Sequence, residues 1–296
     1  MSEITGQTRL YAIMGEPIAQ VRAPMVFNRL FAEAGLDARM AAFQVGPEHL
    51  KTALDGFYHL ANLDGLIVTV PHKMAILPLL AELAPMAARS GAVNVIKRRP
   101  GGGWIGEMVD GLGFAEGMRT AGHDVAGRRV LLVGAGGAGA AIAFALAEQG
   151  CGEMTVFDVD PARAATLVDR LKADGRAAIA ARSPDPAGFP IVINATPLGM
   201  KAEDPLPFDV ARVDTGAVVA EVIMKPRETR LIALARARAN PVVLGERMLD
   251  HQAPFVLDFF GISRIQPSTA ACGRVRVFPV EPPSPASLAA PSREKR

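Results

Sequence analysis

The stretch from Val130 to Ala147 constrains the fold of this chain more than any other segment. It runs without a charged residue for about 18 residues, the lower limit for a helix that spans a membrane. Four glycines fall within six of its positions, between Gly134 and Gly139. Glycines at this density interrupt a long helix. The sequence therefore favours a strand, a tight turn and a helix, with a transmembrane segment as the alternative, and no membrane partner is expected.

The turn fits the pattern G-x-G-x-x-G. It follows an apolar strand, Val130–Val133, and opens a helix, Ala138–Gln149, as a dinucleotide-binding loop requires. The first glycine permits the turn, the second lets the backbone approach a pyrophosphate, and the third allows close packing of helix and strand. The helix N-terminus adds free amides and partial positive charge. A loop that serves packing alone is the alternative. The predicted cofactor contacts are Gly134, Gly136, Gly137, Ala138 and Gly139.

An acidic residue, Asp158, follows the second predicted strand of this unit, 158 − 139 = 19 positions after the last glycine. A carboxylate there accepts hydrogen bonds from the ribose hydroxyls of NAD and repels a 2′-phosphate. Its alternative role is to cap the helix that begins at Pro161, but Asp160, directly before that proline, suits the cap better. NAD is therefore the expected cofactor. NADP remains the alternative, because Arg163 could approach its 2′-phosphate.

The composition narrows the function classes. The 296 residues include 32 Lys+Arg and 30 Asp+Glu, a net charge of +2, which excludes a strongly basic nucleic-acid binder. Aromatic residues make up 5% of the chain, with one tryptophan, Trp104, which argues against a stacking platform for single-stranded nucleic acid. Nucleic acid is therefore not an expected partner.

Cysteine and histidine usage points away from metal and disulfide chemistry. The two cysteines, Cys151 and Cys272, are too few for a disulfide framework or a structural zinc site and indicate reduced thiols. The five histidines show no metal-ligand spacing, so no metal is expected. The segment Met1–Thr8 lacks the apolar stretch of a targeting signal. These features together predict a cytoplasmic protein.

Apolar runs alternate with helical patterns in both halves of the chain, which predicts a fold of the α/β class with mostly parallel sheets. The predicted strands are Leu10–Met14, Ala41–Val45, Leu66–Val70, Val130–Val133, Met154–Phe157, Ile191–Ile193, Ala217–Val222 and Val242–Leu244. The length, about twice that of a typical domain, predicts two α/β domains. They are an N-terminal substrate domain (residues 1–113 plus 245–266) and a Rossmann dinucleotide-binding domain (114–244). The proline-rich segment 267–296 is expected to be a poorly ordered tail.

Six sequence blocks in one order identify the chain as resembling the shikimate/quinate dehydrogenase family over roughly residues 8 to 262. The blocks are Gly15–Ile18, Val68–Lys73, Gly91–Asn94, Asp110–Phe114, Ile193–Met200 and Met248–Gln252. Together they are far more specific than the glycine motif. The resemblance implies hydride transfer between a nicotinamide cofactor and a cyclic hydroxy acid, in aromatic amino acid biosynthesis or quinate metabolism.

The resemblance also assigns roles to residues. It implies that Lys73 and Asp110 are catalytic. A free lysine is a poor base near neutrality, so the pair is expected to share one proton, with Asp110 orienting the ammonium. The alternatives are a surface lysine and a helix-capping aspartate. The implied substrate contacts are Thr69, Asn94 and Gln252, and the implied cofactor contacts are Asn194, Thr196 and Met248. His72, beside the lysine, is taken as a loop residue.

This chain departs from the family pattern at several polar positions. The two serines of the first substrate loop, which hold the substrate carboxylate in the family, are replaced by Val21 and Ala23. An asparagine of the family pattern is replaced by Ile67, and a tyrosine by Met224. Arg22 lies between the first two positions and could hold a carboxylate through two parallel hydrogen bonds. The alternative is that Arg22 points to solvent and the pocket is simply less polar.

The sequence thus predicts an NAD(P)-dependent oxidoreductase acting on a small cyclic hydroxy acid or polyol, with altered carboxylate recognition. Its active site is expected in the cleft between the domains, and its assembly is expected to be a monomer or homodimer. The alternative is a non-catalytic ligand-binding or sensor protein that retains the fold. Retention of Lys73 and Asp110 argues against the alternative, because a sensor has no need of them.

Overall fold

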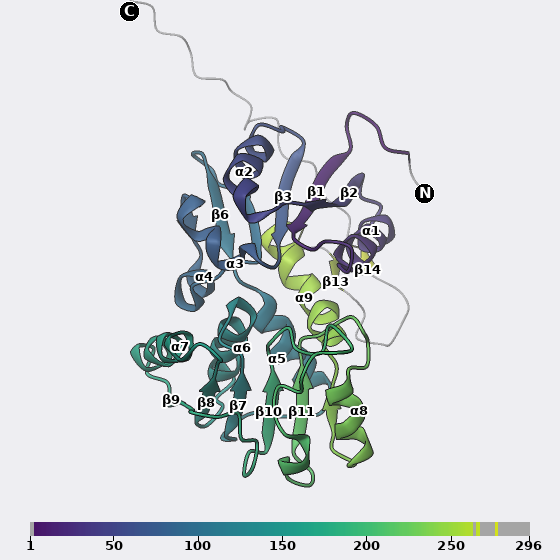
Figure 1. Cartoon of the computed structure of the whole chain (residues 1–296). Helices are drawn as coiled ribbons and strands as arrows, with labels where there is room; N and C mark the ends of the chain where they lie inside the picture. Colours follow the sequence, from purple (N-terminus) through teal and green to yellow (C-terminus); the bar gives the residue numbers. More distant parts are fainter. Residues whose placement is uncertain (1–2, 263–264, 267–275, 278–296) are drawn as a thin grey trace, which may run out of the picture.

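The computed structural model describes residues 3–262, 265–266 and 276–277. The chain forms two α/β domains with helices α5 and α9 between them (Figure 1). This confirms the predicted fold class. Apart from β13 (Ile265–Gln266) and β14 (Arg276–Val277), which pair antiparallel, the predicted tail lies outside the described residues.

The N-terminal domain is built on a six-stranded sheet in the order β2-β1-β3-β5-β6-β4. Its strands are β1 (Arg9–Gly15), β2 (Ala38–Gln44), β3 (Leu63–Val68), β4 (Glu82–Leu83), β5 (Val95–Arg98) and β6 (Trp104–Glu107). Strand β1 runs parallel to β2 and β3, whereas β5 is antiparallel to both of its neighbours. The carboxyl end of β3 therefore meets the amino end of β5. This edge of the sheet faces the second domain.

Short helices connect these strands. They are α1 (Ala23–Glu33), α2 (Leu50–Tyr58), α3 (His72–Ala75) and α4 (Pro85–Ser90), with 3-10 turns at Pro47–His49 and Leu77–Leu79. Helix α1 buries Val26, Phe27, Leu30 and Phe31, the i, i+1, i+4 and i+5 spacing of one helical face. This face packs against the sheet.

The second domain has the strand order β12-β11-β10-β7-β8-β9 with every pairing parallel. Its strands are β7 (Val130–Val133), β8 (Met154–Phe157), β9 (Ala178–Ala180), β10 (Ile191–Asn194), β11 (Val218–Glu221) and β12 (Val242–Val243). Its helices are α6 (Gly137–Glu148), α7 (Pro161–Ala173) and α8 (Arg230–Ala237), with a 3-10 turn at Val210–Arg212. The order reverses between β7 and β10, the point where doubly wound sheets bind dinucleotides.

The uncharged stretch from Val130 to Ala147 forms strand β7, the glycine turn and helix α6. The strand is fully buried, and α6 is buried around nearly its whole circumference, as expected for a central strand and the helix that covers it. No helix within the described part of the chain is long and apolar enough to cross a membrane. The predicted strand, turn and helix are therefore confirmed.

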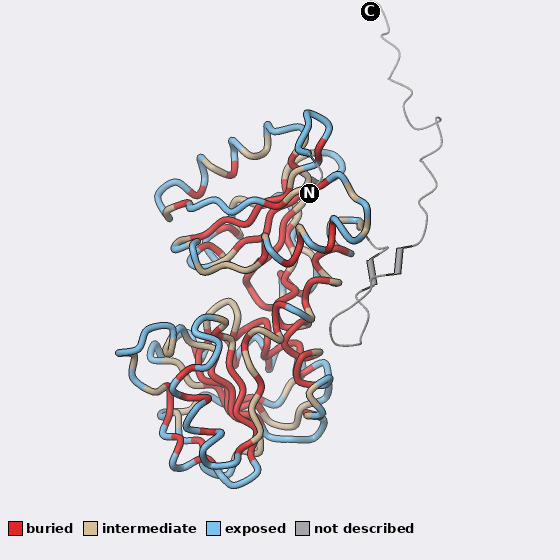
Figure 2. The backbone as a smooth tube through the Cα atoms, turned by 90° about the vertical axis from the view of Figure 1, so that its right-hand side faces the viewer, coloured by how far each residue is buried: buried red, intermediate tan, exposed pale blue. Residues whose placement is uncertain are grey.

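Two long helices connect the domains. Helix α5 (Asp110–Thr120) leads from the first sheet into the second domain, and α9 (Glu246–Phe259) returns. They pack closely at Gly113, which has no side chain. A Cβ atom at this position would lie only 2.5 Å from the backbone oxygen of Met248 and from the Cβ of Gln252. The predicted domain boundary after residue 113 falls inside α5. Figure 2 shows buried backbone continuing through this connection.

A second contact between the domains is ionic. Arg89 of α4 pairs with Glu148 at the end of α6 and, at 2.5 Å, with Asp174 after α7. Arg170 of α7 donates a hydrogen bond of 2.8 Å to the backbone oxygen of Ser90. The domains are therefore joined on one side by the α5–α9 pair and on another by this arginine cluster.

Candidate active site

Lys73 and Asp110 meet where the domains join. Lys73 lies on α3, just after β3, and Asp110 is the first residue of α5. The Lys73 Nζ atom forms an ion pair with Asp110 Oδ2, and their side chains are 13% and 4% exposed. Lys73 is therefore not a surface lysine, the alternative that the sequence left open. An ion pair this buried is strongly held, since removing one partner would leave an uncompensated charge.

Two buried amides extend this pair. Asn94 Nδ2 donates 2.7 Å to Asp110 Oδ1, and the Asn94 Oδ1 accepts 2.8 Å from the backbone amide of Val109. Gln252 of α9 places its Oε1 3.5 Å from Asn94 Nδ2. Both carboxylate oxygens of Asp110 thus have a donor, and the four predicted residues form one connected group drawn from α3, α5, α9 and the residue before β5.

Thr69 lies at the same edge of the first sheet. Its backbone amide donates 2.9 Å to the oxygen of Met14, and its side chain is half-buried. A Cβ atom at Gly15 would collide with the Thr69 methyl group. Gly15 therefore allows the threonine to sit close against the end of β1, on the approach to Lys73.

His72 is not the loop residue that the sequence suggested. It is the first residue of α3 and is completely buried. Its Nε2 lies 2.7 Å from the backbone oxygen of Val45. The ring therefore ties α3 to the segment after β2 and supports the helix that carries Lys73. A four-residue helix is too short to show a helical period in the sequence, which is why it was missed.

The glycine loop has the geometry that the motif requires. Gly134 has φ +109°, a conformation that side chains rarely adopt. A Cβ atom at Gly139 would collide with the Gly134 oxygen, whereas one at Gly136 would meet nothing within 4 Å. Helix α6 begins at Gly137 without a side-chain cap, so its first amides are free for an anion. These residues fit a dinucleotide pyrophosphate.

The loop also borders the buried ion pair. A Cβ atom at Gly137 would lie 3.2 Å from the Lys73 Cβ and 3.3 Å from the Ala92 Cβ. Ala138 is the next residue of α6. The start of the nucleotide-binding helix and the catalytic lysine of the sequence prediction are therefore direct neighbours across the two domains.

Asp158 lies directly after β8 and turns back to the glycine loop. Its Oδ2 accepts 2.7 Å from the backbone amide of Ala135, and its Oδ1 accepts 2.9 Å from that of Asp160. Asp160 caps α7 by accepting 3.0 Å from Ala162, which confirms the predicted cap, whereas the ribose role of Asp158 stays a prediction. Arg163 lies 3.4 Å from Asp160 and is largely exposed.

The loop after β10 is fixed by its own side chains. Asn194 Oδ1 accepts hydrogen bonds from the Thr196 amide at 3.0 Å and from its hydroxyl at 2.6 Å, while Asn194 Nδ2 donates 3.0 Å to the Leu198 oxygen. The Ala195 backbone lies against Gly134. Met248 of α9 is buried, and its backbone oxygen lies against Gly113 of α5. The predicted contacts Asn194 and Thr196 thus lie beside the glycine loop, whereas Met248 is placed against α5.

One buried acid at this edge had no predicted role. Glu221 ends β11, opposite Asn194 in the register, and is fully buried. Its Oε2 accepts 3.0 Å from the Thr229 hydroxyl. Burial raises the pKa of Glu221 to about 7. The sequence feature that could have identified Glu221 is an acidic residue at the end of an apolar strand.

Arg22 is paired with an acid of α9. It precedes α1, its side chain is 36% exposed, and its Nη1 lies 3.7 Å from Glu246 Oε2 at the start of α9. Glu246 also pairs with Arg227 at 2.9 Å. Val21 and Met224, two of the positions that depart from the family pattern, are partly buried against the first domain's apolar cluster.

Residues 13–96 match the shikimate dehydrogenase substrate binding domain, and residues 117–184 match shikimate / quinate 5-dehydrogenase. The chain is 38% identical over 262 residues to the shikimate dehydrogenase (NADP(+)) of Moorella thermoacetica, covering 85% of this chain and 88% of that protein. The chain belongs to the shikimate/quinate dehydrogenase family. It is therefore an oxidoreductase that uses a nicotinamide cofactor.

Two solved structures of the family resemble this one. Shikimate dehydrogenase from Aquifex aeolicus has a TM-score of 0.80 and 31% identity, over 87% of this chain and 94% of that one. Quinate dehydrogenase from Corynebacterium glutamicum, in complex with NAD, has a TM-score of 0.76 and 32% identity, over 86% and 93%. Family members therefore include proteins described with NADP and with NAD.

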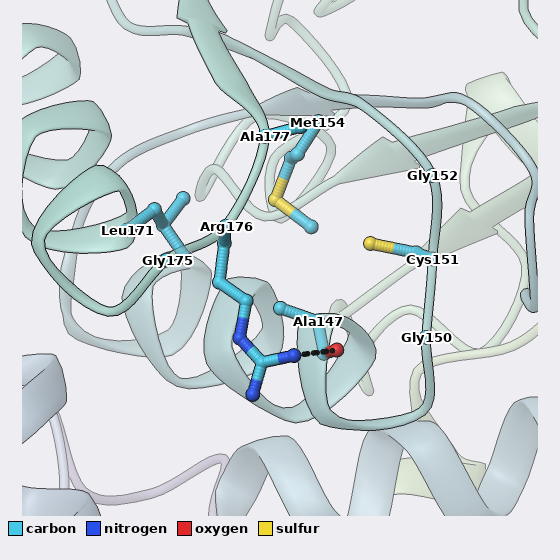
Figure 3. Close-up of a pocket in the computed structure, with 9 residues that line it drawn as sticks. All are labelled: Ala147, Gly150, Cys151, Gly152, Met154, Leu171, Gly175, Arg176 and Ala177. Carbon is cyan, nitrogen blue, oxygen red and sulfur yellow. Dashed lines mark hydrogen bonds between the residues drawn. The ribbon is translucent and has the colours of Figure 1, made fainter.

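A small cavity of about 150 Å³ lies far from this site, at the amino end of the second sheet (Figure 3). Arg176 borders it and donates 3.0 Å to the Ala147 oxygen. Cys151, a free thiol, lines it, and burial raises the pKa of this thiol, which favours an unreactive form. Cys272 lies outside the described residues. We assign no chemistry to this cavity.

Proposed function

We propose that this enzyme interconverts a secondary alcohol and a ketone on a small cyclic hydroxy acid or polyol, with Lys73 and Asp110 as the catalytic pair. The observation that carries the proposal is the buried Lys73–Asp110 ion pair next to the start of α6. Hydride transfer requires a proton-transfer group beside the cofactor site. This arrangement supplies one.

A nicotinamide cofactor held at the glycine loop would supply the hydride acceptor for the oxidation and the hydride donor for the reduction. In the oxidation, Lys73 Nζ as the neutral amine would accept the proton of the substrate hydroxyl and become the ammonium, and in the reduction the ammonium would return that proton to the substrate oxygen. Asp110 Oδ2 accepts from that ammonium, while its Oδ1 is held by Asn94. The carboxylate therefore orients the lysine and offsets its charge as the proton moves. Asn94, Gln252 and Thr69 are proposed to bind the remaining substrate hydroxyls.

We propose NAD as the preferred cofactor. Asp158 sits at the carboxyl end of β8 with its carboxylate against the glycine loop, where a 2′-phosphate would meet negative charge. The cation nearest in sequence, Arg163, is paired with Asp160. Among relatives, the quinate dehydrogenase in complex with NAD provides a precedent, whereas the curated relatives are named for NADP(+).

We propose that the part of the substrate site next to Arg22 has too few free hydrogen-bond donors to bind a carboxylate. The Arg22 charge is offset by Glu246 at 3.7 Å, and Val21 and Met224 offer no hydrogen bond. A carboxylate would compete with Glu246 for the arginine, whereas a neutral ring would meet these apolar side chains without that cost. We therefore expect neutral cyclic diols and polyols to be substrates.

A dehydrogenase screen tests this function. Purified enzyme is incubated with NAD or NADP and a set of cyclic hydroxy acids and neutral diols, and reduced cofactor is followed by absorbance. We expect turnover with NAD and at least one cyclic alcohol. The variant Arg22→Ala should leave the KM of a neutral diol unchanged and change that of its acid counterpart less than about tenfold. A large rise in KM confined to acids would instead identify Arg22 as a carboxylate anchor. Absence of turnover with every alcohol would contradict the proposed function.

A further inference from the structure

Glu221 is a buried acid that the proposed mechanism does not use. It ends β11, it is completely buried, and its Oε1 atom has no hydrogen-bond partner among the residues that the structure describes. Burial raises its pKa to about 7, which the neighbouring Thr229 and Asn194 side chains only partly offset. Burying an acid without a cationic partner costs free energy, and such acids gather at functional sites. Packing alone therefore does not account for this residue.

Thr229 connects Glu221 to helix α8 and to the loop that follows β10. The Thr229 hydroxyl donates 3.0 Å to Glu221 Oε2 and accepts 3.2 Å from the backbone amide of Ile232, so its one proton points at the carboxyl group. Gly199 also contacts this threonine, because a Cβ atom at Gly199 would lie 3.3 Å from the Thr229 Cγ2 atom. Gly199 has φ +112°, a conformation that side chains rarely adopt. The turn at Gly199 therefore packs against the residue that Glu221 holds.

The 194–199 loop connects this acid to the glycine loop. At its start, Asn194 is opposite Glu221 in the parallel pairing of β10 and β11, and its backbone oxygen accepts 3.1 Å from the Val222 amide. Next along the chain, the Ala195 backbone is so close to Gly134 that a Cβ atom there would lie 2.8 Å from the Ala195 carbonyl carbon. The far end of the loop meets the threonine. The loop is therefore held at both ends by β11 and its partners, and it touches the proposed pyrophosphate site between them.

We propose that Glu221 is a positioning residue for cofactor binding, which acts through Thr229 to hold the 194–199 loop against the glycine loop. The inference rests on the proposed cofactor site and extends it to a residue behind that site. The position needs a hydrogen-bond acceptor, since without one the buried Thr229 hydroxyl would lose its partner. The alternative is that Glu221 anchors helix α8 and affects stability alone.

Cofactor binding in the absence of substrate tests this proposal. Isothermal titration calorimetry gives the Kd for NAD and for NADP, and the cofactor that the wild type binds more tightly is used with each variant. Glu221→Leu has a side chain of similar size without the acceptor, and its Kd should rise about 3- to 10-fold, the effect of one hydrogen bond. Glu221→Gln keeps an oxygen that can accept from Thr229, so its Kd should stay within about twofold of the wild-type value. At saturating cofactor, kcat of Glu221→Leu should also stay within about twofold, because the catalytic pair is unchanged.

Val218→Ala is the matched control for a loss of stability, because it truncates a buried side chain at the opposite end of the same strand. It should leave the cofactor Kd unchanged. Three results would overturn the proposal: a wild-type Kd in Glu221→Leu, an equal rise in Val218→Ala, or a rise in Glu221→Gln as large as that in Glu221→Leu.

A second variant covers the case in which Glu221→Leu does not fold. Thr229→Val removes the same hydrogen bond from its other partner, and the same rise in Kd is expected, whereas a wild-type Kd would overturn the proposal. The binding measurement contains no alcohol. Absence of turnover in the alcohol screen would therefore contradict the proposed function without changing this result, and an unchanged Kd would overturn only the role of Glu221.

Discussion

At the residue scale, the site depends on how its polar atoms are occupied. Asp110 accepts from Lys73 on one oxygen and from Asn94 on the other, and the Asn94 oxygen is held by a backbone amide. These contacts fix the carboxylate, and in our proposal Lys73 is the residue that carries the proton. The resemblance of the sequence to a family predicted the pair of Lys73 and Asp110. The connection through Asn94 to Gln252 is a result of the fold, because these residues are 158 positions apart.

In our proposal, the choice between NAD and NADP depends on one side chain, that of Asp158. We predict that Asp158→Asn lowers the preference for NAD over NADP, measured as the ratio of the two kcat/KM values, by about 10-fold or more. The physical reason is the loss of a charge that repels a 2′-phosphate. Asp160→Asn is the matched control, since it removes a neighbouring charge that caps α7. A wild type that prefers NADP, or equal ratios in wild type and Asp158→Asn, would reject the assignment.

A buried acid predicts a pH dependence of stability. The pKa of Glu221 is raised from 4.5 to about 7 by burial, so the folded state holds a proton that the unfolded state has lost. The free energy of unfolding should therefore fall as pH rises between about 4.5 and 7, by at most about 3 kcal/mol. Glu221→Gln should remove this part of the slope. Denaturant titrations across that pH window measure it, and identical slopes in both proteins would contradict the prediction.

At the element scale, the sequence predicted best where long apolar segments have clear ends. Strand β7 and strand β8 have the predicted bounds, and α6 begins within a residue of its predicted start. Strands β5 and β6 were not predicted, because they are short and joined by a tight glycine-rich turn rather than by a helix. Helix α3 was missed for the same reason of length, and with it the buried state of His72. Short elements are fixed by tertiary contacts, which local patterns do not encode.

The contact between α5 and α9 gives an element-scale prediction. In Gly113→Ala the new methyl group would lie 2.5 Å from the Met248 oxygen, so the helices must move apart. We expect a loss of about 1 to 3 kcal/mol in the free energy of unfolding. Gly56→Ala is the matched control, because that helical position has nothing within 4 Å of its Cβ. It should be neutral or stabilising by up to about 1 kcal/mol. Equal stability of the two variants in urea titrations would contradict this packing.

At the scale of the whole molecule, the active site exists because two domains meet. Lys73 comes from the first domain, the glycine loop from the second, and Asp110 and Gln252 from the two connecting helices. The predicted domain boundary lies just after Asp110, inside α5. Asp110 is held by Lys73 and Asn94 of the first domain, and the next residue, Gly111, lies against the Ala141 backbone of α6 in the second domain. The α5–α9 pair and the Arg89 cluster keep these parts in register.

The most direct test of the account is the turnover of Lys73→Ala and Asp110→Asn on the best substrate from the screen. Each variant should lower kcat by about two to four orders of magnitude, the usual contribution of a positioned proton-transfer group. The Kd for NAD, measured by calorimetry, should stay near the wild-type value, because neither side chain belongs to the glycine loop. Near-wild-type kcat in either variant, with the fold intact by circular dichroism, would contradict the central claim that this buried pair carries the chemistry.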